Sequence, residues 1–347
     1  MSILTVWESI AKVGQKTTAV GALALGGLMM NVPQASAAER FVLAHPGNQD
    51  HIYSQMSERF LEKLDALGGS HLKVNYQPGG TLGDWTSIFE QTMQGAIPMS
   101  LTWGASEFDG RLDVLYLAYV VDNWKKATEV YGPGGQMLDV YNEILADLGL
   151  VAIGTIPTDF GSIAIRKGVG KVPVNFPADG SGIKIRVPGL PVAVERFNAL
   201  GFNPVPMPLS EVHTALQLGT IDARTFAPPV EVWQMRDVLE SYILTRDYFE
   251  HGFWLVNKDW WDGLSAADQQ LIERAANDAI NWAWQDAEAL GDEFLEKIKG
   301  FGIDVVELTP AQLAQTKALV YANEWPFMEK KLGAKIMADL REISGQE

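Results

Sequence analysis

Cysteine is absent from the 347-residue sequence. This absence excludes disulfide bonds, thiolate nucleophiles and metal sites that use thiolate ligands. A chain without cysteine suits an oxidising compartment, although the absence does not identify one.

Basic residues are few relative to acidic ones. The sequence has 27 Lys and Arg against 43 Asp and Glu, which gives a net charge of −16 at pH 7. This balance disfavours nucleic acid and anionic membrane surfaces as partners. An anionic ligand would need a local cation to attract it, because the overall field of the protein repels it.

The short motifs of common catalytic sites are also missing. The sequence contains no G-x-S-x-G nucleophile turn, no H-E-x-x-H zinc helix and no G-x-x-x-x-G-K-[ST] phosphate loop. The five histidines are scattered, and none lies four positions from another. We therefore predict no catalytic residues and no cofactor.

The first residues have the order of a secretory signal peptide. Lys12 and Lys16 precede an apolar run over residues 19–32, and the small residues 35–37 follow it. The alternative is an uncleaved membrane anchor, but three glycines interrupt the run. The run is also shorter than the roughly 20 residues that a membrane span needs. We expect cleavage after Ala37.

Removal of this segment leaves about 310 residues with a net charge of −17, because one acidic and two basic residues are lost. No later stretch is long and apolar enough to cross a bilayer, so a soluble mature chain is expected. A chain of this length exceeds the usual single hydrophobic core, and two lobes are therefore expected.

The mature chain alternates between predicted strands and helices. Residues 40–44 and 72–76 have strand patterns, and apolar residues recur at helical spacing between Met56 and Leu67. Strand, helix, strand is the pattern of a parallel sheet covered by helices. Further strands are predicted at residues 150–154, 162–166 and 183–187.

Capping residues mark several predicted helices. Ser210 is expected to cap a helix that Gly219 ends. Thr309 and Gln312 have the spacing of a capping box at the start of another helix. A long helix is expected from residue 265 to about residue 299.

The two predicted lobes are both discontinuous. Lobe I comprises residues 38–163 and 252–291, and lobe II comprises residues 164–251 and 292–347. This division follows from the strand and helix alternation on either side of Ser162 and from the long helix after Ser265. The pattern leaves the strand order open.

The segment from Gly182 to Gly189 carries the strongest local signal. Arg186 alternates with Ile185 and Val187 on an apolar strand, so its side chain points away from theirs at the carboxyl end of the strand. Its partner is either a ligand or a carboxylate of the protein itself.

Tryptophan is abundant, with 11 residues in the chain. Trp85 and Trp103 lie beside turns, where aromatic side chains either wall a ligand cleft or pack in a core. For Trp282 and Trp284, on the predicted long helix, we expect packing in the core.

Five segments resemble the dicarboxylate-binding (DctP-type) solute-binding proteins of tripartite ATP-independent periplasmic (TRAP) transporters. The resemblance extends over nearly the whole mature chain, and the order and spacing of the segments make it specific. The matching segments are residues 43–45, 48–51, 78–83, 182–189 and 206–222.

This resemblance implies an α/β fold of the two-lobed, type II-like periplasmic-binding-protein class. Mixed sheets have helices on both faces, a long helix spans both lobes, and a ligand is buried between them. The residue equivalent to Arg186 makes a paired contact with the carboxylate of the ligand, to which a planar guanidinium is well matched. The resemblance also implies a periplasmic monomer that serves the TRAP membrane subunits.

The sequence departs from the family pattern at three positions. Phe226 replaces an asparagine that hydrogen-bonds the ligand in many members. Thr225 replaces a glutamate that helps to hold a cation in the members that bind keto acids, so no bound metal is expected. Phe160 stands 26 residues before Arg186, where members that bind sialic acid carry an arginine. Sialic acid is therefore not expected as the ligand.

We predict a small organic anion as the ligand, such as a monocarboxylate, a hydroxy or keto acid, an aromatic acid or a sulfonate. Two alternatives remain open, a receptor for a neutral sugar or polyol and a secreted enzyme on the same scaffold. The residues expected to converge on the ligand are Asn48, Trp85, Trp103, Phe160, Arg186, Phe226 and Phe253.

Overall fold

The computed structural model describes residues 40–346. The predicted signal segment and its cleavage site after Ala37 lie outside them. None of the helices in the described part of the chain is both long and apolar enough to cross a bilayer.

The first sheet region has the predicted strand, helix, strand order. Strand β1 (Arg40–Ala44) pairs in parallel with β2 (Lys73–Gln77) and with β3 (Met99–Thr102). Helix α2 (Ile52–Ala66) connects β1 to β2, and α3 (Trp85–Met93) precedes β3. Both helices begin at side-chain caps, His51 for α2 and Asp84 for α3.

The second sheet region repeats this parallel arrangement. Strand β5 (Lys184–Val187) pairs in parallel with β6 (Asn203–Pro206) and with β7 (Ala223–Ala227). The connecting helices are α6 (Pro191–Ala199) and α7 (Leu209–Leu218), and the short helix α8 (Pro229–Gln234) follows β7.

Helix α7 differs from the prediction at its start. It begins at Leu209 after Pro208, and no side chain caps it, so the predicted cap at Ser210 is wrong. The fixed φ of Pro208, −55°, already sets the entry to the helix. Its end is as predicted, because Gly219 adopts a left-handed φ of 71°.

Two long strands join the two regions. Strands β4 (Leu150–Arg166) and β8 (Leu239–Asn257) run antiparallel to each other along their whole lengths. The sequence predicted separate strands at residues 150–154 and 162–166, and the structure instead has one continuous strand. Register shifts near Pro157 and Gly161 interrupt the alternation of side chains without ending the pairing.

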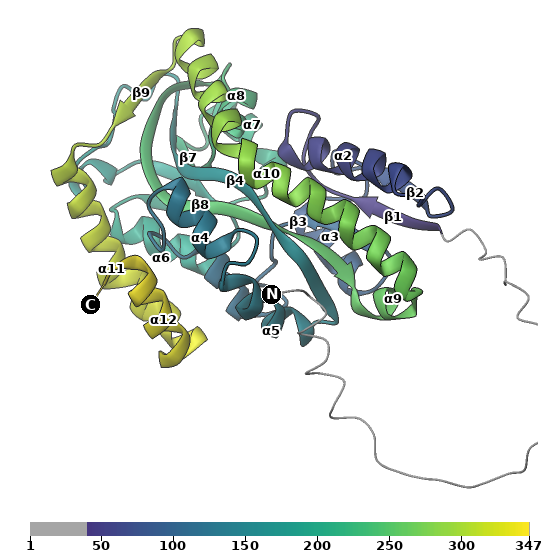
Figure 1. Cartoon of the computed structure of the whole chain (residues 1–347). Coiled ribbons are helices and arrows are strands. Elements are labelled where there is room, and N and C mark those ends of the chain that lie inside the picture. Colours follow the sequence, from purple (N-terminus) through teal and green to yellow (C-terminus); the bar gives the residue numbers. More distant parts are fainter. Residues whose placement is uncertain (1–39, 347) are drawn as a thin grey trace, which may run out of the picture.

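The resulting sheet is mixed, with the strand order β2-β1-β3-β8-β4-β7-β5-β6 and strand β9 (Asp304–Glu307) beside β8. Figure 1 shows β1 to β3 on one side of the crossing strands and β7 with β9 on the other, and the strand order places β5 and β6 next to β7. This is the expected α/β fold with two lobes. The boundaries of the lobes given above stay a prediction.

Helix α10 (Ala266–Phe301) links the two sides. Ser265 caps its start and Gly302 ends it in a left-handed conformation, as the sequence predicted within a few residues. Figure 1 shows α10 running diagonally across the crossing strands, and it contacts α2, β4 and α8. Of the two tryptophans on this helix, Trp284 is buried and Trp282 is half-buried.

The remaining helices cover the rest of the sheet. Helix α11 (Pro310–Leu332) begins with the predicted capping box, in which Thr309 and Gln312 bond each other's backbone. It packs against α6 and against the 3₁₀ helix η2 (Gly110–Tyr116). The other elements are α4 (Trp124–Tyr131), α5 (Met137–Ala146), η3 (Ala178–Gly180), α9 (Lys258–Gly263) and α12 (Ala334–Ser344).

Three buried histidines should make the stability of the fold depend on pH. Burial lowers the pKa of His45 from 6.5 to about 3 and the pKa values of His51 and His251 to about 4. The unfolded chain binds a proton at each histidine below about pH 6.5, whereas the folded chain does not. The free energy of unfolding should therefore fall as the pH drops from about 6.5 to about 4.

Urea denaturation of the wild type and of His51→Asn measures this effect. Asparagine is also a good N-cap, so His51→Asn should retain helix α2 and show a shallower loss of stability over this pH interval. His213→Asn is the control, because the side chain of His213 is 40% exposed and pairs with Asp237 at the surface, and it should not make the loss of stability shallower. Equal slopes for wild type and His51→Asn would contradict the assignment.

Candidate ligand-binding site

A cavity with a free volume of about 50 Å³ lies where the two sheet regions meet the crossing strands. Four of the seven predicted site residues line it, namely Trp85, Trp103, Arg186 and Phe226. The other lining residues are Tyr116, Pro188, Leu190, Leu209, Glu231, Tyr248 and Glu250.

Arg186 lies near the carboxyl end of β5, as the strand pattern predicted. Its side chain is only 3% exposed, and its Nε donates to the carbonyl of Met207 at 3.0 Å. Within residues 40–346 it forms no ion pair with any carboxylate of the protein. The guanidinium therefore lines the cavity as a buried cation without a direct ion-pair partner among the described residues.

The electrostatic surroundings of Arg186 favour binding of an anion. Burial, and secondly the nearby charge of Arg224, lower the pKa of Arg186 to about 9. The guanidinium remains charged at neutral pH but has lost most of its hydration. An anion placed against it would offset this desolvation cost.

Arg224 on β7 is already neutralised by the protein. It donates to the carboxylate of Glu231, on the first turn of α8, and to the carbonyl of Phe226 at 2.9 Å. Its side chain is fully buried. Arg186 is therefore the cation of the cavity that is available to a ligand.

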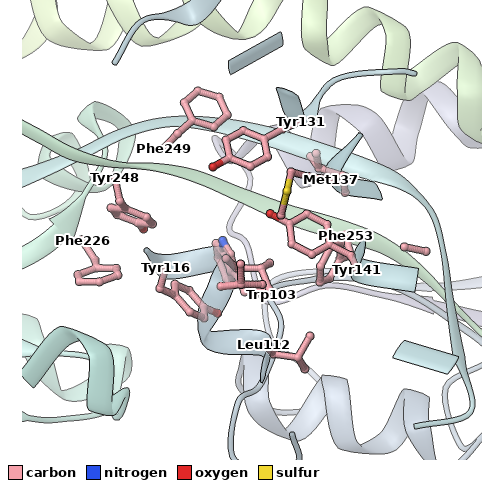
Figure 2. Packing of buried hydrophobic residues seen from close by; sticks show 14 of the residues in the cluster. Trp103, Leu112, Tyr116, Tyr131, Met137, Tyr141, Phe226, Tyr248, Phe249 and Phe253 are labelled. Carbon is pink, nitrogen blue, oxygen red and sulfur yellow. The ribbon is translucent and has the colours of Figure 1, made fainter. Parts of the chain in front are cut away.

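Phe226 forms an aromatic wall of the cavity. Its backbone has a φ of 53°, which is uncommon for a residue with a side chain. Its ring centroid lies 4.3 Å from that of Tyr248, and the guanidinium of Arg196 lies 5.0 Å from it. Figure 2 shows Phe226 and Tyr248 gathered with Tyr116 and Trp103 at one end of the aromatic cluster.

Glu250 on β8 contributes a buried carboxylate to the same cavity. The hydroxyl of Tyr248 donates to Oε2, whereas Oε1 has no hydrogen-bond partner among the described residues. Burial, and secondly the charge of Glu231, raise the pKa of Glu250 well above its usual value. No sequence motif pointed to this residue among 43 acidic ones.

The wall on the other side comes from the first sheet region. Trp103 follows β3, and Trp85 is the first residue of α3, where Thr102 Oγ1 donates to its carbonyl at 3.1 Å. The indole Nε1 of Trp103 and the hydroxyl of Tyr53 are buried and have no partner among the described residues. Both sheet regions thus contribute aromatic and polar groups to the same part of the protein.

Comparison with known proteins agrees with this architecture. The model of the bacterial extracellular solute-binding protein family 7, DctP, matches residues 43–330. The chain belongs to this family. It is thus a DctP-type solute-binding protein of the TRAP class, as the sequence segments indicated.

Relatives of this DctP-type protein are named as periplasmic binding proteins. The ectoine/5-hydroxyectoine-binding protein UehA of Ruegeria pomeroyi is 25% identical over 95% of this chain and 93% of its own length. The 2,3-diketo-L-gulonate-binding protein YiaO of Escherichia coli is 26% identical over 82% of this chain and 86% of its own length. Both relatives are thus named for the small molecule that they bind.

A solved structure supports the two-lobed fold of the family. The sugar acid binding protein DctPAm of Advenella mimigardefordensis, in complex with galactonate, has a TM-score of 0.81 with this protein at 21% identity. The match covers 89% of this chain and 98% of that protein. At this identity the likeness concerns the fold alone.

Three predicted site residues of this DctP-type protein lie outside the cavity around Arg186. Asn48 is exposed, and its side-chain oxygen accepts from Nε2 of Gln234 at 3.0 Å. Phe160 lines a separate cavity beside Trp124. Phe253 is fully buried and packs against Tyr141, on the far side of Trp103 in Figure 2.

The hydrogen bond between Asn48 and Gln234 connects the loop after β1 with α8. This hydrogen bond therefore joins the first sheet region to the second at the protein surface, outside the cavity. The residues that the sequence did not single out, Tyr116, Glu231, Tyr248 and Glu250, come from η2, α8 and β8.

Proposed function

We propose that this protein is the exported receptor of a TRAP transporter and that it binds a small organic carboxylate between its lobes. It delivers this ligand as a monomer to the membrane subunits and does not transform it. The observation that carries the proposal is Arg186, a buried cation in the cavity with no ion-pair partner among the described residues.

The chemistry of the guanidinium supports a carboxylate ligand. The two oxygens of a carboxylate match two parallel N–H donors of a guanidinium. Among the described residues, Arg186 donates a hydrogen bond to the protein only from its Nε. The ligands named for the relatives, galactonate, 2,3-diketo-L-gulonate and ectoine, all carry a carboxylate. Aromatic walls such as Trp103 and Phe226 provide the apolar lining that small-molecule sites commonly have.

Closure of the lobes follows from the position of the cavity. Arg186 and Phe226 approach the ligand from the second sheet region, and Trp85 and Trp103 approach it from the first. A ligand that contacts both sides binds the closed form more tightly than the open form. It therefore shifts the population toward closure by the difference between the two affinities.

A thermal-shift screen tests the proposed function. The screen contains the three carboxylates named above, a library of organic acids and a matched set of neutral sugars and polyols. A ligand at about a hundred times its dissociation constant stabilises the folded state by about 2.7 kcal/mol, which is readily seen. We expect hits among the carboxylates, whereas hits only among neutral compounds would overturn the proposal.

Export is the second testable part of the proposal. We expect the protein recovered from the periplasmic fraction of an expressing bacterium to begin at Ala38, because the small residues before it form a signal-peptidase site. Mass measurement of the intact protein distinguishes this form from the full 347-residue chain. Recovery of the full-length chain in the membrane fraction would contradict cleavage.

A further inference from the structure

Glu250 faces the same cavity as Arg186 but is not needed to hold a simple carboxylate. Its side chain is buried with the hydroxyl of Thr158 nearby, and one of its two oxygens, Oε1, has no hydrogen bond of normal geometry within the described part of the chain. The other oxygen accepts from the hydroxyl of Tyr248. A buried polar atom without a partner is costly, so this oxygen is a site for a hydrogen-bond donor of the ligand.

When Glu250 is ionised, the charges around the cavity balance without a ligand. Arg186 and Arg224 are the cations, and Glu231 and Glu250 are the carboxylates. A ligand with one negative charge and nothing else would leave an uncompensated charge in a space with little water. Such a net charge is costly because little water is present to solvate it.

We propose that the ligand is a small zwitterion, whose carboxylate is bound by Arg186 and whose protonated nitrogen donates to Oε1 of Glu250. This inference rests on the proposed function and specifies the ligand class of that site. A zwitterion adds no net charge to the cavity and gives each end of the ligand an opposite charge on the protein.

The aromatic walls are compatible with a cationic nitrogen. The faces of tryptophan, tyrosine and phenylalanine rings attract cations, and Trp103, Tyr116, Phe226 and Tyr248 all line the cavity. Arg196 already lies near the rings of Phe226 and Tyr248, at 5.0 and 5.8 Å from their centroids. Trp85, Trp103 and Tyr116 are therefore the lining rings that have no protein cation over them among the described residues.

A simple anion accompanied by a proton on Glu250 is the competing possibility. Burial raises the pKa of Glu250, so a protonated and neutral Glu250 would also remove the excess charge. The titratable and charged groups near Glu250 come from several elements. They are Tyr53 on α2, Tyr116 on η2, Arg186 on β5, Arg224 on β7, Glu231 on α8 and Tyr248 on β8.

Pairs of isosteric ligands separate the two possibilities. Proline has a ring NH₂⁺ where tetrahydrofuran-2-carboxylate has a ring oxygen. Pipecolate and tetrahydropyran-2-carboxylate differ in the same way. A third pair is 4-aminobutyrate and 4-hydroxybutyrate. We expect the zwitterions among these pairs and in the larger library to stabilise the protein, and their anionic isosteres to do so weakly.

Calorimetric titration of Glu250→Gln then tests the contact itself with the zwitterion found. The amide keeps the shape of the side chain and an oxygen for Tyr248, but it removes the negative charge. We expect zwitterion binding to weaken by about 10- to 100-fold, because the charge-assisted hydrogen bond is lost. Binding of the isosteric anion should be unchanged or tighter.

Glu62→Gln is the matched control, because Glu62 is exposed on α2, and it should bind as the wild type does. The ligand pairs test the wild-type protein, so the result does not depend on the folding of the variant. If only simple anions bind and Arg186→Ala abolishes their binding, the zwitterion inference is overturned while the carboxylate receptor stands. If only neutral compounds bind, the proposed function itself fails.

Discussion

Arg186→Ala should weaken binding of the carboxylate found in the screen by about 30-fold to several thousand-fold, equivalent to about 2–5 kcal/mol. The loss is large because the carboxylate would be desolvated in the closed cavity without its counterion. Among the described residues no other cation lines the cavity, and Arg224 beside it is already paired with Glu231.

Arg186→Lys should recover only part of this loss. An ammonium group retains the charge, but it is a compact point charge that cannot offer two parallel donors to one carboxylate. Burial also disfavours the charged form of a lysine at this position. We expect the affinity to fall from wild type to Arg186→Lys and again to Arg186→Ala. The first step measures the contribution of the paired geometry, and the second measures the contribution of the charge.

Calorimetric titration measures the affinities, and small-angle scattering follows the compaction on binding. Arg274→Ala is a matched control, because Arg274 is exposed on α10 and should bind and compact as the wild type does. If Arg186→Ala binds within a few-fold of wild type and still compacts, the guanidinium does not hold the ligand. A neutral sugar or polyol would then become the favoured ligand class.

The parts of the fold that the sequence predicted depend on local patterns. The β1, α2, β2 unit and the ends of α10 and α11 are set by alternation, helical spacing and capping residues that lie close together in the chain. The continuous strand β4 was not predicted, because its bulges near Pro157 and Gly161 hide the alternation. The pairing with β8 continues through both irregularities and keeps that segment in the strand.

The site residues also divide into those that local sequence patterns predict and those that depend on tertiary contacts. Arg186 was predictable because its strand, its turn and its alternation with apolar neighbours lie within eight residues. Tyr248 and Glu250 could not be distinguished from other residues of β8, because their role depends on which elements cross that strand. Glu231 enters the cavity only through the tertiary contact of α8 with Arg224.

A buried cluster of charged residues packs against two residues that line the cavity, Tyr116 and Phe226. Arg196 on α6 donates to Asp247 on β8 at 2.6 Å and to Glu324 on α11 at 2.7 and 2.9 Å. It also donates to the carbonyl of Tyr116, and its guanidinium lies 5.0 Å from the ring of Phe226. The side chains of all three charged residues are at most 1% exposed.

Arg196→Met should lower the free energy of unfolding by about 3–5 kcal/mol, because it leaves Asp247 and Glu324 buried without their cation. Burial already raises the pKa of Glu324, and loss of the guanidinium raises it further. A carboxyl whose folded pKa is raised destabilises the fold above that pKa and is relieved as the pH falls through it. The defect should therefore be smaller in mildly acidic buffer than at neutral pH.

The triple variant Arg196→Met, Asp247→Asn, Glu324→Gln provides the internal control. It replaces the two buried carboxylates that Arg196→Met leaves unpaired. It should therefore regain part of the stability that Arg196→Met loses, although both variants lack the guanidinium. Urea denaturation of wild type, single and triple variants at neutral pH gives the comparison. If the single variant unfolds within about 1 kcal/mol of wild type, the cluster does not stabilise the fold to the extent that its burial implies.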